Sequence, residues 1–446
     1  MNTADLLVAM LPEHLERAAW SAERIEAHRR EALPATLAHA IANSPFYARR
    51  FRGLDAARFT LEDLASLPVL TKDEMMESFD DFVTDRRVTR RLAEELLSKT
   101  GETPTLLLDE YVVLASGGSS GVRGMFLFGL RAATDYVLSG VRASVARVLS
   151  GAAPTAGRMR VGMVAATSAV HATRGLPALF SGGLMDLTCV PASLPLAEIA
   201  RRVEDLQPTS LQGYATVLAM LADEKAAGRL TISPRTVTTT SEPLTPDLRE
   251  RIERGFGVGA ADQFGASEGI MGTSDPGSSA IAMPGDLAIL EFVDQQGRPV
   301  PPGMESAKVL LTTLYNPVQP LIRYELNDRM TLVDTGAADG HPRVTVAGRS
   351  DDLLRYGDVV VHPHAIRSVL VHTPAVREYQ VKQTGEGVDL DVVTYGACLD
   401  AADLAARTQK ALATAGLPSP RVHVRAVDRL PRDERSGKVR RIVPKK

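Results

Sequence analysis

The chain has 446 residues and a nearly balanced charge, with 51 Lys and Arg against 54 Asp and Glu and a formal net charge of −3. At roughly 100–200 residues per domain, this length predicts about two to four domains. A hydrophobic fraction of 44% and a charged fraction of 24% are typical of globular proteins and exclude disordered or collagen-like chains. The balanced charge predicts no nucleic-acid partner and no anionic membrane surface.

Cys189 and Cys398 are far apart in the sequence, which excludes a disulfide framework and a cysteine zinc site. No stretch reaches the roughly 18 apolar residues that span a bilayer. The N-terminal segment carries Asp5 and Glu13 where a signal peptide would have a basic run and then an apolar run. We therefore expect a soluble cytoplasmic protein that has no membrane partner.

The front of the chain is predicted to be helical over residues 12–42, because apolar residues recur there at helical spacing before Asn43-Ser44-Pro45 breaks the pattern. Strand-like and helical runs alternate after about residue 110, at 160–165, 196–206, 219–228 and 235–240. This alternation favours an α/β body built on largely parallel sheets.

Near residue 280 the pattern changes to β, and the runs 286–294 and 307–315 predict a hairpin. The last 96 residues begin at Asp351 and contain strand-like runs at 379–383, 389–395 and 421–427 and a helical run at 402–416. We therefore expect an α/β protein with a large N-terminal domain over 1–350, made of α/β subdomains plus a β-rich part. A small mobile α+β domain is expected over 351–446.

Two Gly- and Ser-rich segments carry the first candidate chemistry. In LASGGSSGVRGMF (114–126), backbone amides and serine hydroxyls could wrap phosphate oxygens, although the segment is neither a Walker A loop nor a GxGxxG turn. In QFGASEG (263–269), Glu268 could hold Mg²⁺ beside such phosphates, because Mg²⁺ prefers one or two carboxylates plus phosphate oxygens. Taken alone, either segment is more often a plain surface loop.

Three further segments complete the set. Asp328 in LIRYELNDRM (321–330) could accept hydrogen bonds from ribose hydroxyls, GRSDDLLRYGDVVVHPHAI (348–366) covers the predicted domain boundary, and LPRDERSGKVRR (430–441) contains Lys438. From residue 421 to the end, ten Lys and Arg stand against three acidic residues. Because no aromatic residue lies between these charges for base stacking, the basic tail indicates phosphate handling rather than nucleic-acid binding.

The order and separation of these five segments resemble the adenylate-forming superfamily of acyl-CoA synthetases, peptide-synthetase adenylation domains and luciferases. Within it, SPFYARRF (44–51) and LPVLTKDEM (67–75) resemble the N-terminal segment of the phenylacetate-CoA ligase group. The resemblance runs from about residue 30 to the end of the chain. It implies an AMP-forming ligase that uses ATP and Mg²⁺ to activate an aryl or arylacetic acid, releases pyrophosphate and transfers the acyl group to coenzyme A.

The resemblance also implies roles for individual residues. Those implied for ATP binding are Ser116, Gly118, Ser119, Ser120, Gly121, Arg123, Ser241, Glu242, Pro243, Phe264, Gly265, Asp328 and Arg349. Those implied for catalysis are Lys438, Arg349, Ser267 and His171, and those implied for the acid pocket are His171, Gly213, Tyr214, Gly265 and Ala266. Glu268 would hold Mg²⁺, and Asp351 would be the hinge about which the small domain turns.

The sequence departs from the family pattern at three places. Val122 stands where the phosphate loop usually has a lysine, Leu326-Asn327 replace the usual Thr-Gly, and Gly357 lies one residue away from the common pattern. These departures leave open a different acceptor: a carrier-protein thiol, an amine or another small nucleophile of a natural-product pathway. A non-catalytic nucleotide-binding relative is a third hypothesis, against which the retained charged residues argue. The identity of the acid and the oligomeric state, a homodimer included, also stay open.

Overall fold

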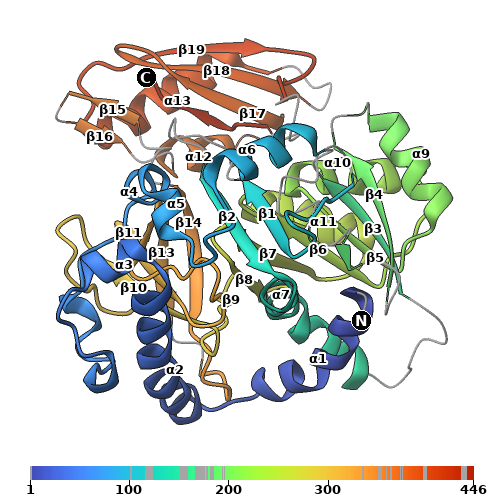
Figure 1. Ribbon diagram of the computed structural model, residues 1–446. Helices are drawn as coiled ribbons and strands as arrows, with labels where there is room; N and C mark the ends of the chain where they lie inside the picture. The colour runs from blue at the N-terminus through green and yellow to red at the C-terminus, as the bar shows by residue number, and fades with distance from the viewer. Residues whose placement is uncertain are drawn as a thin grey trace. The chain divides into compact units, whose positions relative to one another are not determined.

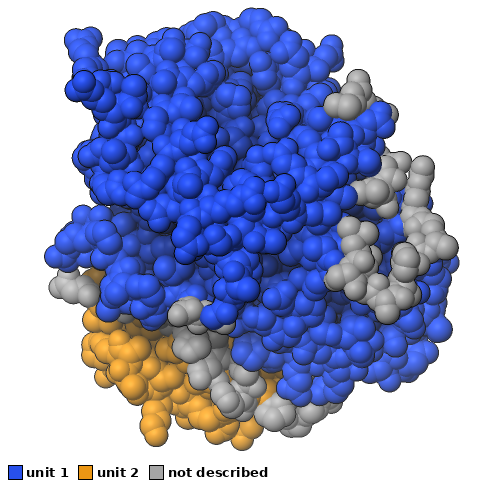
Figure 2. Space-filling model, turned by 90° about the horizontal axis from the view of Figure 1, so that it is seen from below, with its two compact units in different colours: residues 1–347 blue, residues 348–446 orange. Residues whose placement is uncertain are grey.

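Figure 1 shows the computed structural model of the chain. It describes residues 3–100, 103–115, 124–150, 159–165, 176, 179–180, 185–192, 194, 196–333, 336–349, 354–357, 359–361, 364–371, 373, 375–394, 399–432 and 439–445. The chain forms two compact units, 1–347 and 348–446, which are coloured separately in Figure 2. The division follows residue 347, where the sequence predicted a boundary after residue 350. Across the described ranges, no helix is both long and apolar enough to cross a membrane.

The first unit begins with helices, as predicted, but a turn at 18–21 separates α1 (Thr3–Arg17) from α2 (Ala22–Asn43). Ser21 starts the second helix, because its hydroxyl accepts a hydrogen bond from the Arg24 amide. Ser44 ends α2 and caps the next helix in the same way. Further helices of this unit are α3 (Pro45–Arg50), α4 (Lys72–Glu77), α5 (Phe79–Phe82), α6 (Arg90–Lys99), α7 (Leu130–Ser150), α9 (Leu196–Leu206), α10 (Ala215–Ala226) and α11 (Pro246–Phe256).

The largest sheet in the described part of the chain has nine strands, in the order β13-β14-β9-β8-β7-β6-β5-β3-β4. The pairs from β4 to β7 are parallel, and the β7–β8, β8–β9 and β9–β14 pairs are antiparallel. The predicted strands at 160–165 and 235–240 are confirmed. The strands are β3 (Met159–Ala165), β4 (Met185–Pro191), β5 (Ser210–Gly213), β6 (Thr236–Thr240), β7 (Ala260–Ala266), β8 (Ile270–Ser274), β9 (Ile281–Ala282), β13 (Asp328–Val333) and β14 (Arg343–Arg349).

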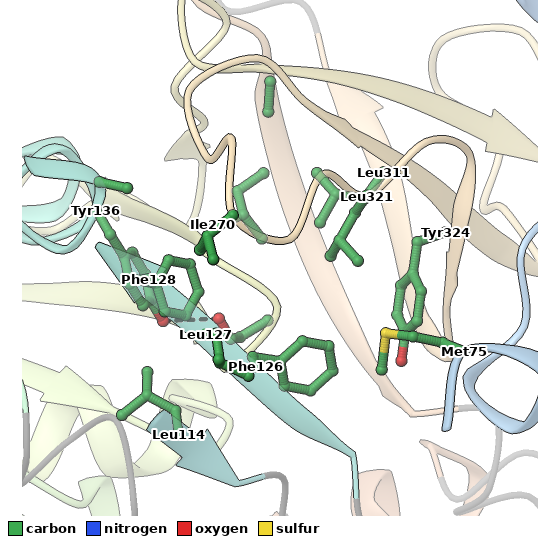
Figure 3. Packing of buried hydrophobic residues seen from close by; sticks show 14 of the residues in the cluster. Met75, Leu114, Phe126, Leu127, Phe128, Tyr136, Ile270, Leu311, Leu321 and Tyr324 are labelled. Carbon is green, nitrogen blue, oxygen red and sulfur yellow. Dashed lines mark hydrogen bonds between the residues drawn. The ribbon is translucent and has the colours of Figure 1, made fainter. Parts of the chain in front are cut away.

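Two smaller sheets complete the β-rich part of the first unit. Strands β10 (Ala288–Val293) and β11 (Lys308–Thr313) form the predicted antiparallel hairpin, and β12 (Tyr324–Leu326) pairs with β11. Strands β1 (Tyr111–Ala115) and β2 (Met125–Gly129) form a separate antiparallel pair. The main hydrophobic core surrounds β2, where Phe126, Leu127 and Phe128 are all buried (Figure 3).

The second unit is an α+β fold, as predicted. Its four-stranded sheet has the order β19-β18-β17-β20, and β15 pairs with β16 in a short ribbon. Helix α13 is capped by the Asp400 side chain and packs Leu404 and Leu412 into the core of this unit. The elements are β15 (Leu354–Tyr356), β16 (Val359–Val361), α12 (His364–Val371), β17 (Val376–Gln383), β18 (Gly387–Thr394), α13 (Ala401–Thr414), β19 (Arg421–Ala426) and β20 (Ile442–Val443).

Candidate active site

Strands β5, β6 and β7 are neighbouring parallel strands of the nine-stranded sheet, and predicted site residues lie at or after the carboxyl end of each. Gly213, the last residue of β5, is paired with Thr239 near the end of β6, and β6 is in turn paired with β7. The register therefore places Gly213 and the segment 241–243 at the carboxyl ends of neighbouring strands. Strand β7 continues from Gln263, the partner of Thr240, through Ala266 to the residues 267–269 between β7 and β8, called here the β7–β8 turn. In open α/β sheets, ligands bind at the carboxyl ends of the strands.

The segment after β6 is held by a side chain of its own. Ser241 has a φ of 65°, a left-handed conformation that is uncommon for a residue other than glycine and is often found at functional sites. The Glu242 carboxylate accepts two hydrogen bonds through one oxygen, from the Thr216 amide at 3.0 Å and the Thr216 hydroxyl at 2.7 Å. These bonds cap the first turn of α10, where the Tyr214 side chain makes no capping bond. Glu242 thus ties the end of β6 to the helix that follows β5.

The β7–β8 turn closes tightly. The Gly269 amide donates to the Ala266 carbonyl at 2.9 Å, and Gly269 has a φ of 96°. A Cβ on Gly269 would lie 2.7 Å from a ring carbon of Phe128, so only glycine fits at this position. Burial raises the pKa of the Tyr136 hydroxyl well above its ordinary value, and the charge of Glu268 raises it further. The Glu268 carboxylate is therefore close enough to the Tyr136 hydroxyl to affect its pKa.

The predicted acid-pocket residues occupy different surroundings. Gly265 is exposed, and Ala266 is buried in the main core. Tyr214 is fully buried among the apolar residues of a second core cluster, between the parallel strands and α10. Helix α10 begins directly after Tyr214 and packs into the same core. Phe264, predicted to contact the nucleotide, packs partly buried against the main core.

Asp328 and Arg349 lie at the ends of neighbouring strands of the sheet. Asp328 is the first residue of β13, and Arg349 is the last residue of β14 and belongs to the second unit. The predicted phosphate loop joins β1 to β2. The predicted residues that lie outside the described ranges are Ser116, Gly118, Ser119, Ser120, Gly121, Arg123, His171, Asp351 and Lys438.

The buried side-chain amides of Gln319 and Asn316 hold β2, the strand that follows the predicted phosphate loop. The Leu127 amide donates to the Gln319 side-chain oxygen at 2.7 Å, and the Gln319 nitrogen donates to the Met125 carbonyl at 3.1 Å. The Asn316 nitrogen donates to the Leu127 carbonyl at 2.8 Å. Sequence analysis missed both amides, because these contacts join residues nearly 200 positions apart and leave no local pattern.

The carboxylates near the ends of these strands fit a metal ion that binds together with the phosphates of a nucleotide. Among the described residues, no group of three or more His, Cys, Asp or Glu side chains could hold a metal ion. Mg²⁺ bound to phosphate groups needs only one or two protein carboxylates, and Glu268 in the β7–β8 turn could supply one. Asp262, earlier on β7, is a different carboxyl: burial raises its pKa to about 6, and it accepts a hydrogen bond from the Thr239 hydroxyl at 2.9 Å.

Comparisons with known proteins find sequence relatives and a similar fold among CoA ligases. No family model matches the chain. A phenylacetate-coenzyme A ligase of Thermus thermophilus is 26% identical over 395 residues, which cover 82% of this chain and 79% of the relative. The phenylacetate-coenzyme A ligase of Escherichia coli is 26% identical over 375 residues, covering 79% and 77%. A crystal structure of 2-hydroxyisobutyryl-CoA ligase with its acyl-adenylate is similar in fold, with a TM-score of 0.71, 18% identity and coverage of 96% of this chain and 90% of that one.

Proposed function

We propose, from the chain's place beside the phenylacetate-CoA ligases in the adenylate-forming superfamily, that the protein is an AMP-forming acid–CoA ligase. Its substrates would be ATP, coenzyme A and a carboxylic acid, with an aryl or arylacetic acid favoured. The observation that supports the proposal is that segment 241–243 and the β7–β8 turn follow two neighbouring, paired strands, β6 and β7. Both segments match nucleotide motifs of the family, and the fold brings them to neighbouring strands.

The chemistry explains why such a site needs positive charge. A carboxylate is a poor electrophile, because its leaving group would be an oxide. In the first step a carboxylate oxygen forms a bond to the α-phosphorus of ATP, and the bond to the β-phosphate oxygen breaks, so that pyrophosphate leaves. Two anions meet in this step, and catalysis therefore consists of positioning and of cationic stabilisation of the developing charge.

Four residues would share this work. Ser267 would contact the α-phosphate and Glu268 would hold Mg²⁺, which would neutralise phosphate charge when bound. Arg349 and Lys438 would supply fixed positive charge from the end of β14 and from the basic tail. Both lie in the second unit, so we propose that this unit turns about Asp351 between the two half-reactions.

In the second step, the thiol sulfur of coenzyme A would attack the acyl carbon, a carbon–sulfur bond would form and AMP would leave. A carrier-protein thiol or an amine could take the place of coenzyme A, because the first step would be the same. The departures from the family pattern at Val122 and Leu326-Asn327 keep these acceptors in consideration.

Pyrophosphate release across a panel of acids, each with and without coenzyme A, tests the proposal directly. We expect release that depends on both ATP and an aryl or arylacetic acid, and thioester formation when coenzyme A is added. Adenylation without thioester formation would move the acceptor to a carrier protein or an amine. An enzyme that releases no pyrophosphate with any acid of the panel would contradict the proposal.

Lys438→Ala tests the proposed role of the basic tail. Because this lysine would act on the transition state, its loss should lower acid-dependent pyrophosphate release by at least roughly 10²–10³-fold. Lys445→Ala removes a cation from the same tail and is the matched control. A Lys438→Ala protein with full adenylation activity would remove this residue from the mechanism.

A further inference from the structure

Two tyrosine hydroxyls hold the backbone on either side of the β7–β8 turn. The Tyr136 hydroxyl donates to the Ala266 carbonyl at 2.6 Å, directly before the turn. The Tyr315 hydroxyl donates to the Gly269 carbonyl at the end of the turn. The two rings come from α7 and from the segment that follows β11, so distant parts of the chain meet at these two carbonyls.

Both phenols remain neutral donors. Burial raises the pKa of the hydroxyls of Tyr136 and Tyr315 well above their ordinary values. Tyr136 is fully buried, and its ring lies beside Phe128, with 5.6 Å between the ring centroids (Figure 3). A neutral donor fixes a carbonyl without adding a counter-charge, so these two bonds hold the turn without neutralising Glu268.

Phe128 and Tyr315 pack closely against Gly269 in the turn. A Cβ on Gly269 would lie 2.7 Å from the Tyr315 hydroxyl oxygen as well as from the Phe128 ring. The Gly269 amide also closes back on the Ala266 carbonyl, which therefore accepts two hydrogen bonds. Ser267 and Glu268 are the two residues between the fixed carbonyls.

We propose that Tyr136 and Tyr315 are positioning residues, which fix the backbone so that Ser267 and Glu268 meet the phosphates and Mg²⁺ in one geometry. This inference rests on the proposed adenylation function and adds to it two residues from outside the family motifs. Loosening the turn should lower the reaction rate more than the stability of the fold, because misplacement of a charged group weakens transition-state stabilisation.

The surroundings of the two phenols predict unequal effects. Tyr315 is partly exposed and lines a cavity of about 180 Å³ together with Arg17, His28, Arg131, Asp135 and Asp286. This cavity is large enough to hold water, and we expect a water molecule to replace the lost hydroxyl in Tyr315→Phe. Tyr136 is fully buried, so without its hydroxyl the Ala266 carbonyl keeps only the bond from the Gly269 amide, and we expect the larger loss here.

The test uses Tyr136→Phe and Tyr315→Phe, which keep the rings and remove only the hydroxyls. Tyr47→Phe is the matched control, because Tyr47 is also fully buried and donates to a carbonyl, that of Pro320, at 2.8 Å. Acid-dependent exchange of pyrophosphate into ATP is measured over a range of Mg²⁺ concentrations. We expect a loss of about tenfold in kcat/KM for Tyr136→Phe and about threefold for Tyr315→Phe, with a raised Mg²⁺ requirement. Tyr47→Phe should keep parental kinetics although it loses similar stability.

Hydrogen–deuterium exchange of the peptide that covers 264–272 gives a readout that needs no activity. Its amides should exchange faster in Tyr136→Phe and Tyr315→Phe and at the parental rate in Tyr47→Phe. If Tyr136→Phe does not fold, Tyr315→Phe at its partly exposed position carries the same test.

Equal kinetic losses in all three variants, or parental exchange of this peptide in the two turn variants, would overturn the positioning role. A parent enzyme without acid-dependent exchange would instead contradict the proposed function, and the deuterium measurement would still decide whether the phenols hold the turn.

Discussion

Two glutamates follow neighbouring strands at the same edge of the sheet, yet the structure holds them in opposite ways. Glu242, after β6, is held by its own carboxylate, which caps α10 through Thr216. Glu268, after β7, lies in a turn whose flanking backbone carbonyls are held by two phenols. The Glu242 carboxylate has a structural contact, whereas the Glu268 carboxylate is the one that we propose serves a ligand. We therefore expect the atoms that hold each residue to distinguish its role better than its place along the strand ends.

Glu268→Gln should have the largest effect on this comparison. The amide keeps one oxygen for Mg²⁺ and loses the charge that a hard cation requires. We expect acid-dependent pyrophosphate release to fall by roughly 10²-fold or more and the Mg²⁺ requirement to rise, with little change in the free energy of unfolding. A magnesium titration of pyrophosphate exchange checks this. An unchanged titration curve would make Glu268 a structural residue like Glu242.

Gly269→Ala should break the turn itself. Its φ of 96° disfavours any side chain, and the new Cβ would lie 2.7 Å from both Phe128 and Tyr315. We expect a loss of about 3 kcal/mol in the free energy of unfolding, measured with urea. Gly257→Ala is the control, since Gly257 has a φ of 75° with no atom within 4 Å and should lose only about 1 kcal/mol. Equal losses at the two sites would show that the turn is not closely packed.

Glu242→Ala should destabilise the protein without changing its use of magnesium. The variant removes a charge-assisted cap from α10, and we expect a loss of about 2 kcal/mol in the free energy of unfolding. A double-mutant cycle with Thr216→Val measures how much of that loss belongs to the bond between the two side chains. A shift in the Mg²⁺ titration as large as that of Glu268→Gln would contradict the comparison.

Local patterns in the sequence predicted the elements better than the contacts that make the site. The helix over 196–206 matches its predicted bounds, because apolar residues on one face and polar residues on the other are a local signal. The turn at 18–21 was missed, since Ser21 becomes a helix cap only when its neighbours leave the preceding helix.

The contacts that hold the site depend on partners far away in the chain. Tyr136 and Ala266 are 130 positions apart, and nothing around either residue indicates that a phenol will meet that carbonyl. Gly269 carried a signal, because a glycine at the end of a motif marks a positive φ or a close approach, but the neighbour that requires it came only from the structure. Tyr214, predicted for the acid pocket, is fully buried, because an aromatic ring at a strand end suits a core as well as a pocket.

The smallest expected effect concerns a third carboxyl group, that of Asp262, which lies on β7, the strand that leads into the β7–β8 turn. Burial raises its pKa from an ordinary value near 3.8 to about 6, against the opposing effects of the Thr239 hydroxyl and the Arg249 charge. The folded protein therefore holds this proton more tightly than the unfolded chain does. Between about pH 4 and pH 6 the folded state binds more protons, so the free energy of unfolding falls as the pH rises through this window and is level above it.

Asp262→Asn removes this titration and keeps an oxygen that can accept from the Thr239 hydroxyl. We expect the variant to match the parent near pH 4 and to exceed it by about 1–2 kcal/mol at pH 7, measured by urea unfolding across the pH range. Because Asp262 is largely neutral below about pH 5, the Mg²⁺ titration of the variant should stay parental in that range. A variant that is less stable than the parent at pH 7 would mean that the Asp262 carboxylate, like that of Glu242, is held by its charge.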